Sequence, residues 1–171
     1  MNALVLSAIF GVIMMFSGIL LHGKKAIRNV AVAGMILLLI TNVLEMNGIG
    51  LLRTADTHEL NFVALFTVDV KGMMAFDRFA LLFNTIVFIS ALLYLLLSSR
   101  DMEKVGVNYA DYLALIFFII CGITLTSSFR SLLILFLGIE IISIPLYILT
   151  GSDKRNLKSN EASLKYFLLG A

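Results

Sequence analysis

Residues 131–151 read SLLILFLGIEIISIPLYILTG, and Glu140 is the one charged side chain among them. An α-helix needs about 20 mostly apolar residues to cross the hydrocarbon core of a membrane. This stretch therefore predicts a membrane-spanning helix. The composition agrees, because the 171 residues are 60% hydrophobic and 14% charged, with a mean hydropathy of +1.02, whereas a soluble domain is usually about 25% charged.

Similar apolar runs occur along the whole chain. They predict five full spans and a sixth that is cut off at the end of the sequence, at 3–21, 29–45, 78–98, 109–129, 131–150 and 161–171. The second run is short, so either it borrows flanking residues or Glu45 sits at the membrane interface. We predict an all-α membrane protein, a polytopic transmembrane helix bundle that forms a single domain over residues 1–171.

An outer loop, 46–77, is expected between the second and third spans. Residues 66–71 of this loop, FTVDVK, alternate between apolar and polar side chains before Gly72. A period of two is typical of a half-buried strand. We therefore expect a short β-hairpin in this loop.

The basic residues indicate the orientation of the bundle, since cytoplasmic loops collect Lys and Arg. Met1, Asn2 and Ala3 carry no side-chain charge, so a cleavable secretory signal is not predicted. With the N-terminus outside, eight basic residues fall in inner loops (Lys24, Lys25, Arg28, Arg100, Lys104, Lys154, Arg155, Lys158) and four in outer ones (Arg53, Lys71, Arg78, Arg130). This distribution favours an outside N-terminus.

Several function classes do not fit this composition. The formal net charge is +2, and the basic residues form short groups instead of a stripe that follows a phosphate backbone, so nucleic acid is not an expected partner. Cys121 is the single cysteine, which excludes a disulfide framework and a cysteine-based metal site. No phosphate-binding glycine loop, histidine pair or nucleophile elbow occurs in the sequence. We expect no metal or cofactor to be bound by this chain, and we expect lipid around it.

Glu140 is the strongest candidate for chemistry. It lies about nine residues from either end of its predicted helix, which corresponds to a depth of roughly 13 Å. An ionisable group at that depth costs about 2.5 to 3.5 kcal/mol, so it needs a partner or a water-filled cavity. Burial disfavours a carboxylate anion and a nearby lysine favours it, which is what a proton relay requires. Alternatively, Glu140 stays protonated and only hydrogen-bonds a neighbouring helix.

Three neighbours extend this candidate site. Pro145 has no N–H for the carbonyl of Ile141, so that carbonyl is freed to hold water beside the acid. Ser143 and Tyr147 fall on roughly the same helical face as Glu140 and continue a polar stripe. Equally, these side chains bind neighbouring helices and have no role in transport.

Lys165 lies four residues after Glu161 in the sixth run. A pair with this spacing and polarity mildly stabilises a helix. From the residues alone, an interfacial salt bridge with a snorkelling lysine is the favoured interpretation.

Three stretches resemble a known family. Residues 136–147 read FLGIEIISIPLY, residues 161–171 read EASLKYFLLGA, and residues 77–83 read DRFALLF. They are similar to subunit N of bacterial and plastid-type NADH:quinone oxidoreductases, the antiporter-like membrane-arm subunits of respiratory complex I. The two related antiporter-like subunits commonly have a tryptophan before the glutamate, whereas this chain has Ile139.

The resemblance implies that Glu140 and Lys165 lie on a proton path. It also implies that NADH oxidation and quinone reduction occur in partner subunits, which hold the flavin, the iron–sulfur clusters and the quinone. The partners would be the other membrane-arm subunits, and the location would be the inner (plasma) membrane of the cell. The family continues through further lysine-bearing helices, so this chain alone is not expected to pump.

Two other classes stay open. A subunit of a multi-subunit sodium/proton antiporter or of a membrane-bound hydrogenase has a similar bundle and buried glutamate. A membrane scaffold without transport activity is the third class, with Glu140 as a packing hydrogen bond.

Overall fold

The structure is a computed structural model that describes residues 1–20, 23–54, 63–68, 71–102, 109–153 and 156–170. Some sequence predictions fall outside these ranges. They concern Leu21 and Ala171 at the ends of two expected spans, part of the expected outer loop, and Lys104, Lys154 and Arg155 of the charge count.

The elements are α1 (Asn2–Leu20), α2 (Lys24–Met46), β1 (Ile49–Thr54), β2 (Val63–Val68), α3 (Arg78–Met102), α4 (Tyr109–Ser127), α5 (Leu132–Thr150) and α6 (Leu157–Gly170). Helices α1 to α5 are each long and apolar enough to span a membrane. The prediction of an all-α polytopic bundle with five full helices and a shorter sixth is therefore confirmed.

Two helices begin earlier than the hydropathy pattern indicated. Helix α2 begins at Lys24 instead of residue 29, because lysine and arginine are good helix formers even where they are too polar for the membrane core. Helix α6 begins at Leu157 instead of residue 161. The side chain of Asn156 accepts a hydrogen bond from the backbone nitrogen of Lys158 at 3.0 Å, which satisfies a free N–H at the helix start.

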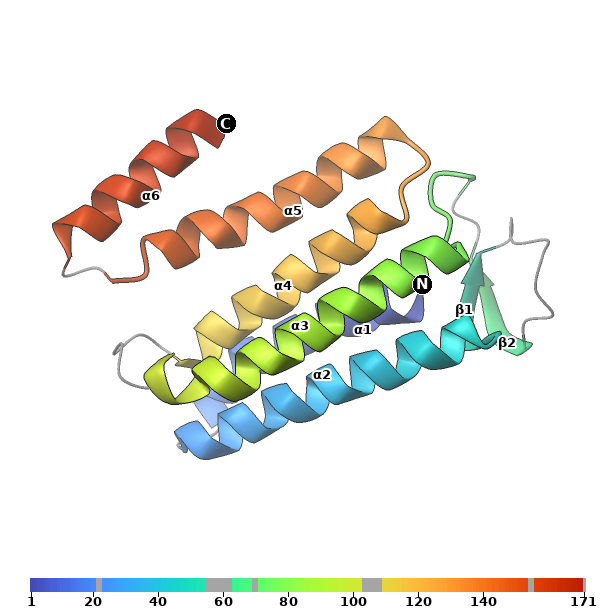
Figure 1. The fold of residues 1–171 in the computed structure, drawn as a ribbon, viewed down its shortest axis with the longest axis horizontal. Coiled ribbons are helices and arrows are strands. Elements are labelled where there is room, and N and C mark those ends of the chain that lie inside the picture. Colours follow the sequence, from blue (N-terminus) through green and yellow to red (C-terminus); the bar gives the residue numbers. More distant parts are fainter. Residues whose placement is uncertain (21–22, 55–62, 69–70, 103–108, 154–155, 171) are drawn as a thin grey trace.

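Helices α1 to α4 form a bundle in which α4 is the most buried (Figure 1). Its Phe117 is fully buried and stacks on Phe10 of α1, with ring centroids 5.7 Å apart. Met35 and Leu38 of α2 and Phe88 of α3 complete the same apolar core. This core holds the four helices together and leaves one side of α4 for α5.

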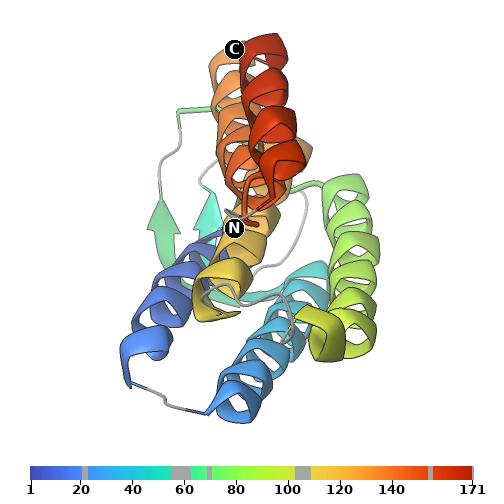
Figure 2. The ribbon, with the colours of Figure 1, turned by 90° about the vertical axis from the view of Figure 1, so that its left-hand side faces the viewer.

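Helix α5 packs on the outer side of α4, and α6 packs on α5 in turn. Figure 2 shows both helices projecting from one side of the bundle. Only 11% of the α5 span is buried, compared with 50% of the α4 span. The side chains of α5 are therefore largely exposed to lipid or to further protein.

The chain start, the ends of α2 and α4 and both strands lie at one end of the bundle (Figure 1). Strands β1 and β2 pair in parallel, with Ile49 opposite Val63 and Thr54 opposite Val68. Two strands were expected in this loop, but a hairpin requires antiparallel strands, so the predicted hairpin is wrong.

Glu45 is buried within the protein at this end, near the end of α2, and the span borrows flanking residues at its start. Its carboxylate accepts from the backbone nitrogen of Asn2 at 3.1 Å and forms an ion pair with the Met1 amine. The Asn2 side chain in turn accepts from Leu52 N at 2.8 Å and donates to Leu52 O at 3.3 Å. These contacts fix the start of α1 to the end of α2 and to β1.

Candidate functional site

Helix α5 crosses α4 at two glycines. A Cβ on Gly122 would lie 2.7 Å from Ile142 Cγ1 and 3.0 Å from the Gly138 carbonyl oxygen. A Cβ on Gly138 would collide with Thr126 Cγ2 and lie 3.1 Å from its backbone nitrogen. Small residues allow two helix backbones to approach this closely. Gly138, Ile142 and the buried Pro145 therefore form the side of α5 that faces α4.

Glu140 lies on a different side of α5. It follows Gly138 by two residues, and two helix positions are separated by about 200°. The side chain is half-buried and lies roughly 12 Å from the start of α5 and roughly 15 Å from its end. Within the described residues its carboxylate has no hydrogen bond or ion pair. The acid is thus held in the middle of a span by packing on the opposite face of its helix.

By helical spacing, Ser143 and Tyr147 lie on roughly the same face of α5 as Glu140, whereas Pro145 does not. The Ser143 hydroxyl donates to the carbonyl oxygen of Ile139 at 2.8 Å, so its hydrogen is used within α5 while its oxygen can still accept. Pro145 is directed toward α4. Along α5, Ser143 lies about one turn from Glu140 and Tyr147 about two turns from it.

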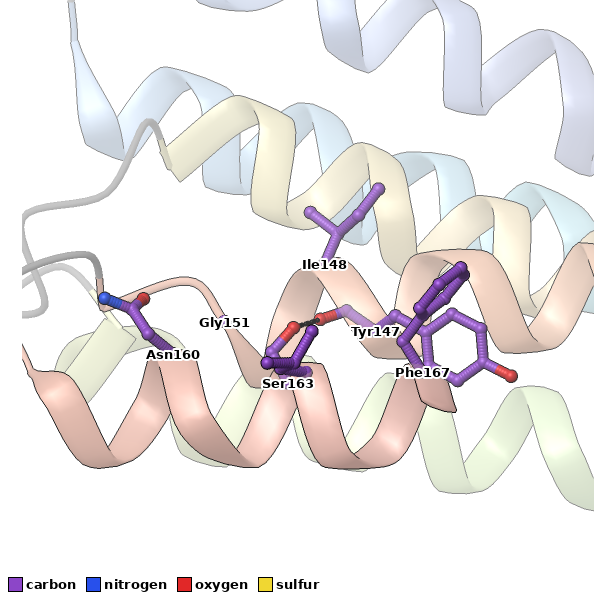
Figure 3. A pocket seen from close by; sticks show the side chains of 7 residues that line it. Tyr147, Ile148, Gly151, Asn160, Ser163 and Phe167 are labelled. Carbon is purple, nitrogen blue, oxygen red and sulfur yellow. Dashed lines mark hydrogen bonds between the residues drawn. The ribbon is translucent and has the colours of Figure 1, made fainter. Parts of the chain in front are cut away.

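Tyr147 is the main contact between α5 and α6 (Figure 3). Its ring packs edge-to-face against Tyr166 and Phe167, with centroid distances of 4.9 and 5.6 Å. Its carbonyl oxygen accepts from the Ser163 hydroxyl at 2.8 Å. One turn further along, the Ser159 hydroxyl donates to Thr150 O at 2.6 Å. Serine and aromatic side chains thus fix α6 to the C-terminal half of α5.

A cavity of about 360 Å³ opens between the two helices at this contact. Its lining combines aromatic and aliphatic side chains with serine and asparagine, from Tyr147, Ile148, Gly151, Asn160, Ser163, Leu164 and Phe167 (Figure 3). The lining has no carboxylate and no basic group. Glu140 lies two turns away along α5 and is not part of it.

Lys165 lies on an exposed face of α6. Its ammonium is 2.6 Å from Glu161 Oε1, and the two side chains are 68% and 62% exposed. The contacts of α6 with α5 are made at Tyr147 and Thr150, on the C-terminal side of Glu140. The structure therefore pairs Lys165 with Glu161 and does not bring it to Glu140.

Two features were not predicted from the sequence: the glycines that position Glu140, and a pair of buried asparagines, Asn42 and Asn84. Small residues and amides inside apolar runs are a known signal of helix–helix contacts in membranes. The sequence therefore contained a signal for helix–helix contacts, but it did not show which helices contact each other.

The site and fold define a polytopic helical membrane protein with an ionisable group in mid-span. The family described as "NADH:quinone oxidoreductase/Mrp antiporter, TM" matches residues 130–171, which include α5, α6 and Glu140. The chain is thus similar to antiporter-like membrane subunits.

Relatives with this similarity carry the name NADH-quinone oxidoreductase subunit N. The protein from Flavobacterium psychrophilum is 30% identical and that from Cytophaga hutchinsonii is 32% identical, each across all of this chain. The chain spans about a third of their length, 34% in each case. The predicted resemblance is confirmed. The similarity to these subunit N proteins covers all of this chain, which corresponds to about a third of their length.

A solved structure supports the fold independently. A chain of respiratory complex I from Thermus thermophilus with bound aureothin superposes with a TM-score of 0.65 over 98% of this chain and 32% of its own length. The two sequences are 22% identical. The arrangement of helices described above is therefore one that occurs in a complex I structure.

Proposed function

We propose that this chain is part of a proton-translocating, antiporter-like membrane subunit of NADH:quinone oxidoreductase, and that Glu140 titrates on its proton path. The observation that carries the proposal is the placement of Glu140. It lies in mid-span on a face of α5 turned away from α4, with its carboxylate uncommitted within the described chain. A carboxyl group in such a place is a functional group by default, because its insertion is costly.

Lys165 serves in this proposal as the second titratable group of the path. It would exchange its ion pair with Glu161 for proton or charge transfer when further protein covers α6. Ser143 and Tyr147 would contribute hydroxyl groups beside Glu140. The freed carbonyl of Ile141, opposite Pro145, would accept a hydrogen bond from water or from a neighbouring helix.

The redox chemistry belongs to other subunits in this proposal. NADH oxidation and quinone reduction take place where flavin, iron–sulfur clusters and quinone bind, and this chain contributes only charge and proton movement. Its partners are the other membrane-arm subunits. The location is the cell inner membrane, with the chain start and the β1–β2 end of the bundle outside.

The test is Glu140→Gln in the assembled complex in membrane vesicles. Glutamine keeps the size and hydrogen-bonding capacity of the side chain but cannot release a proton. We expect NADH-driven acidification, followed with a fluorescent pH probe, to fall to a small fraction of the unmodified rate, with the amount of assembled complex unchanged. Asp111→Asn is the matched control, because Asp111 is exposed in the first turn of α4. Unchanged acidification in Glu140→Gln would refute the proposed role.

A second candidate is a subunit of a multi-subunit sodium/proton antiporter, because the matching family covers both classes. In that case, transport would be driven by a sodium gradient in the absence of NADH. Vesicles energised with NADH or with a sodium gradient distinguish the two functions.

A further inference from the structure

Two asparagines are completely buried in the bundle, at a distance from the site described above. Asn42 of α2 and Asn84 of α3 each have 0% exposure. An amide offers one oxygen acceptor and two N–H donors, and inside a membrane bulk water cannot satisfy them. Each polar atom of this pair therefore needs a partner within the bundle.

The protein supplies some of these partners. The Asn42 amide nitrogen donates to the carbonyl oxygen of Leu81 at 2.9 Å and to the hydroxyl of Thr85 at 2.8 Å. The Asn84 side-chain oxygen accepts from the hydroxyl of Ser127 on α4 at 2.8 Å. The two amides thus connect α2, α3 and α4.

One polar atom of each amide has no protein partner within the described residues. These are the side-chain oxygen of Asn42, which is an acceptor, and the side-chain nitrogen of Asn84, which is a donor. The two asparagines lie at one level of the bundle, because Asn42 bonds to Leu81 and Thr85, which flank Asn84 within one turn of α3. That level is roughly 6 Å from the end of α2 and roughly 9 Å from the start of α3.

We propose that Asn42 and Asn84 hold an internal water molecule between α2, α3 and α4. Water donates to the Asn42 oxygen and accepts from the Asn84 nitrogen, so one molecule satisfies both. A cation would be repelled by the N–H group of Asn84, and an anion by the oxygen of Asn42. If the Asn84 amide is reversed, the two free atoms are both oxygens, and one water donates to each. Buried waters typically make about three hydrogen bonds to such otherwise unsatisfied groups.

The bound water completes a polar contact among three helices. A fully satisfied polar network specifies one arrangement of its helices, whereas apolar side chains of similar shape allow several. The water thus fixes the relative position of α2, α3 and α4, and this role is independent of Glu140 and of proton transport.

The direct test is an experimental density map of the unmodified protein in lipid nanodiscs, together with any subunits that copurify, at a resolution that shows ordered water. We expect one density peak within hydrogen-bond distance of both the Asn42 oxygen and the Asn84 nitrogen. A map that shows buried water elsewhere but none here overturns the proposal. Direct contact between the two amides overturns it as well.

Hydroxyl-radical footprinting in ¹⁸O-labelled water provides a second measurement, because radicals formed from a bound water label the side chains beside it. We expect Leu81 and Phe88 to be labelled in the unmodified protein and the labelling to drop severalfold in Asn84→Leu. Thr41→Val is the control, since among the described residues the Thr41 hydroxyl bonds to carbonyls of its own helix alone. Equal labelling in the unmodified protein and in Asn84→Leu contradicts a water held by this amide.

Discussion

Lys165 and Glu161 form an exposed ion pair on α6, with 2.6 Å between their charged groups. Exposed pairs of this spacing contribute about 0.3 to 0.5 kcal/mol to stability. The pair by itself therefore explains little of what Lys165 does. If Lys165 carries protons, it must release one during the cycle, and arginine cannot do so because its guanidinium stays charged.

We predict that Lys165→Arg and Lys165→Gln both reduce NADH-driven proton transport strongly, while assembly is retained. A simple salt bridge would survive in Lys165→Arg, so this variant separates the two roles. Transport and NADH oxidation are measured together in membrane vesicles. Lys158→Arg on the same helix, which is exposed, is the control. Full transport in Lys165→Arg would reduce Lys165 to a structural residue.

At the scale of the elements, the crossing of α4 and α5 positions Glu140. We predict that Gly138→Ala destabilises the protein by about 1 to 3 kcal/mol, the usual cost of overpacking a well-packed contact. The added methyl group meets Thr126 on α4, and the backbone nitrogen of Thr126 cannot move away without shifting the helix. The measurement is thermal unfolding in detergent.

Two variants control this experiment. Thr126→Ser removes the methyl group that collides with the new Cβ and should restore part of the stability when combined with Gly138→Ala. Gly23→Ala should have little effect, because its Cβ would meet only Ala26 at an ordinary 3.9 Å. If Gly138→Ala is as stable as Gly23→Ala, the close approach of the two helices is not present in the protein.

Within the described chain, Tyr147 makes the two aromatic contacts that join α5 to α6, in addition to the serine hydrogen bonds. We predict that Tyr147→Ala weakens this docking by about 1 to 3 kcal/mol, since each of its two ring contacts is worth about 0.5 to 1.5 kcal/mol. Tyr147→Phe keeps both rings in contact and should dock normally. Formation of a disulfide between cysteines introduced at positions 148 and 164, which both line the α5–α6 cavity, measures the docking. Equal crosslinking in all three proteins would contradict this prediction.

At the scale of the whole molecule, β1 and β2 lie at one end of the bundle, and the end of α5 and the start of α6 lie at the opposite end (Figure 1). The excess of basic residues near the second side favours the cytoplasm for it. Exposed asparagines mark the two sides, Asn47 after α2 and Asn156 before α6.

We predict that a cysteine at position 47 reacts with a membrane-impermeant maleimide in intact cells or spheroplasts, in a background in which Cys121 is replaced by alanine. A cysteine at position 156 should react only after the membrane is permeabilised. The reverse pattern would place the N-terminus inside and would require a different orientation for the proton path.

The membrane location, the long helices and the presence of a mid-span acid could be predicted from the sequence. These are local properties, since each depends on the length and polarity of one continuous run of residues. The hydropathy pattern placed the helix starts less well at Lys24 and Leu157, where a polar first turn is still helical.

The tertiary structure alone decided how these elements are combined. It showed that β1 and β2 pair in parallel, that Glu45 is buried against the chain start, and that Lys165 meets Glu161 instead of Glu140. It also showed that Gly138 turns Glu140 away from α4 and that Asn42 and Asn84 share one level of the bundle. Most of these features depend on contacts between different helices or strands. The pairing of Lys165 with Glu161 depends on a contact between successive turns of α6. Apolar periodicity identifies a buried face, but the shapes of all the packed side chains together determine its partner.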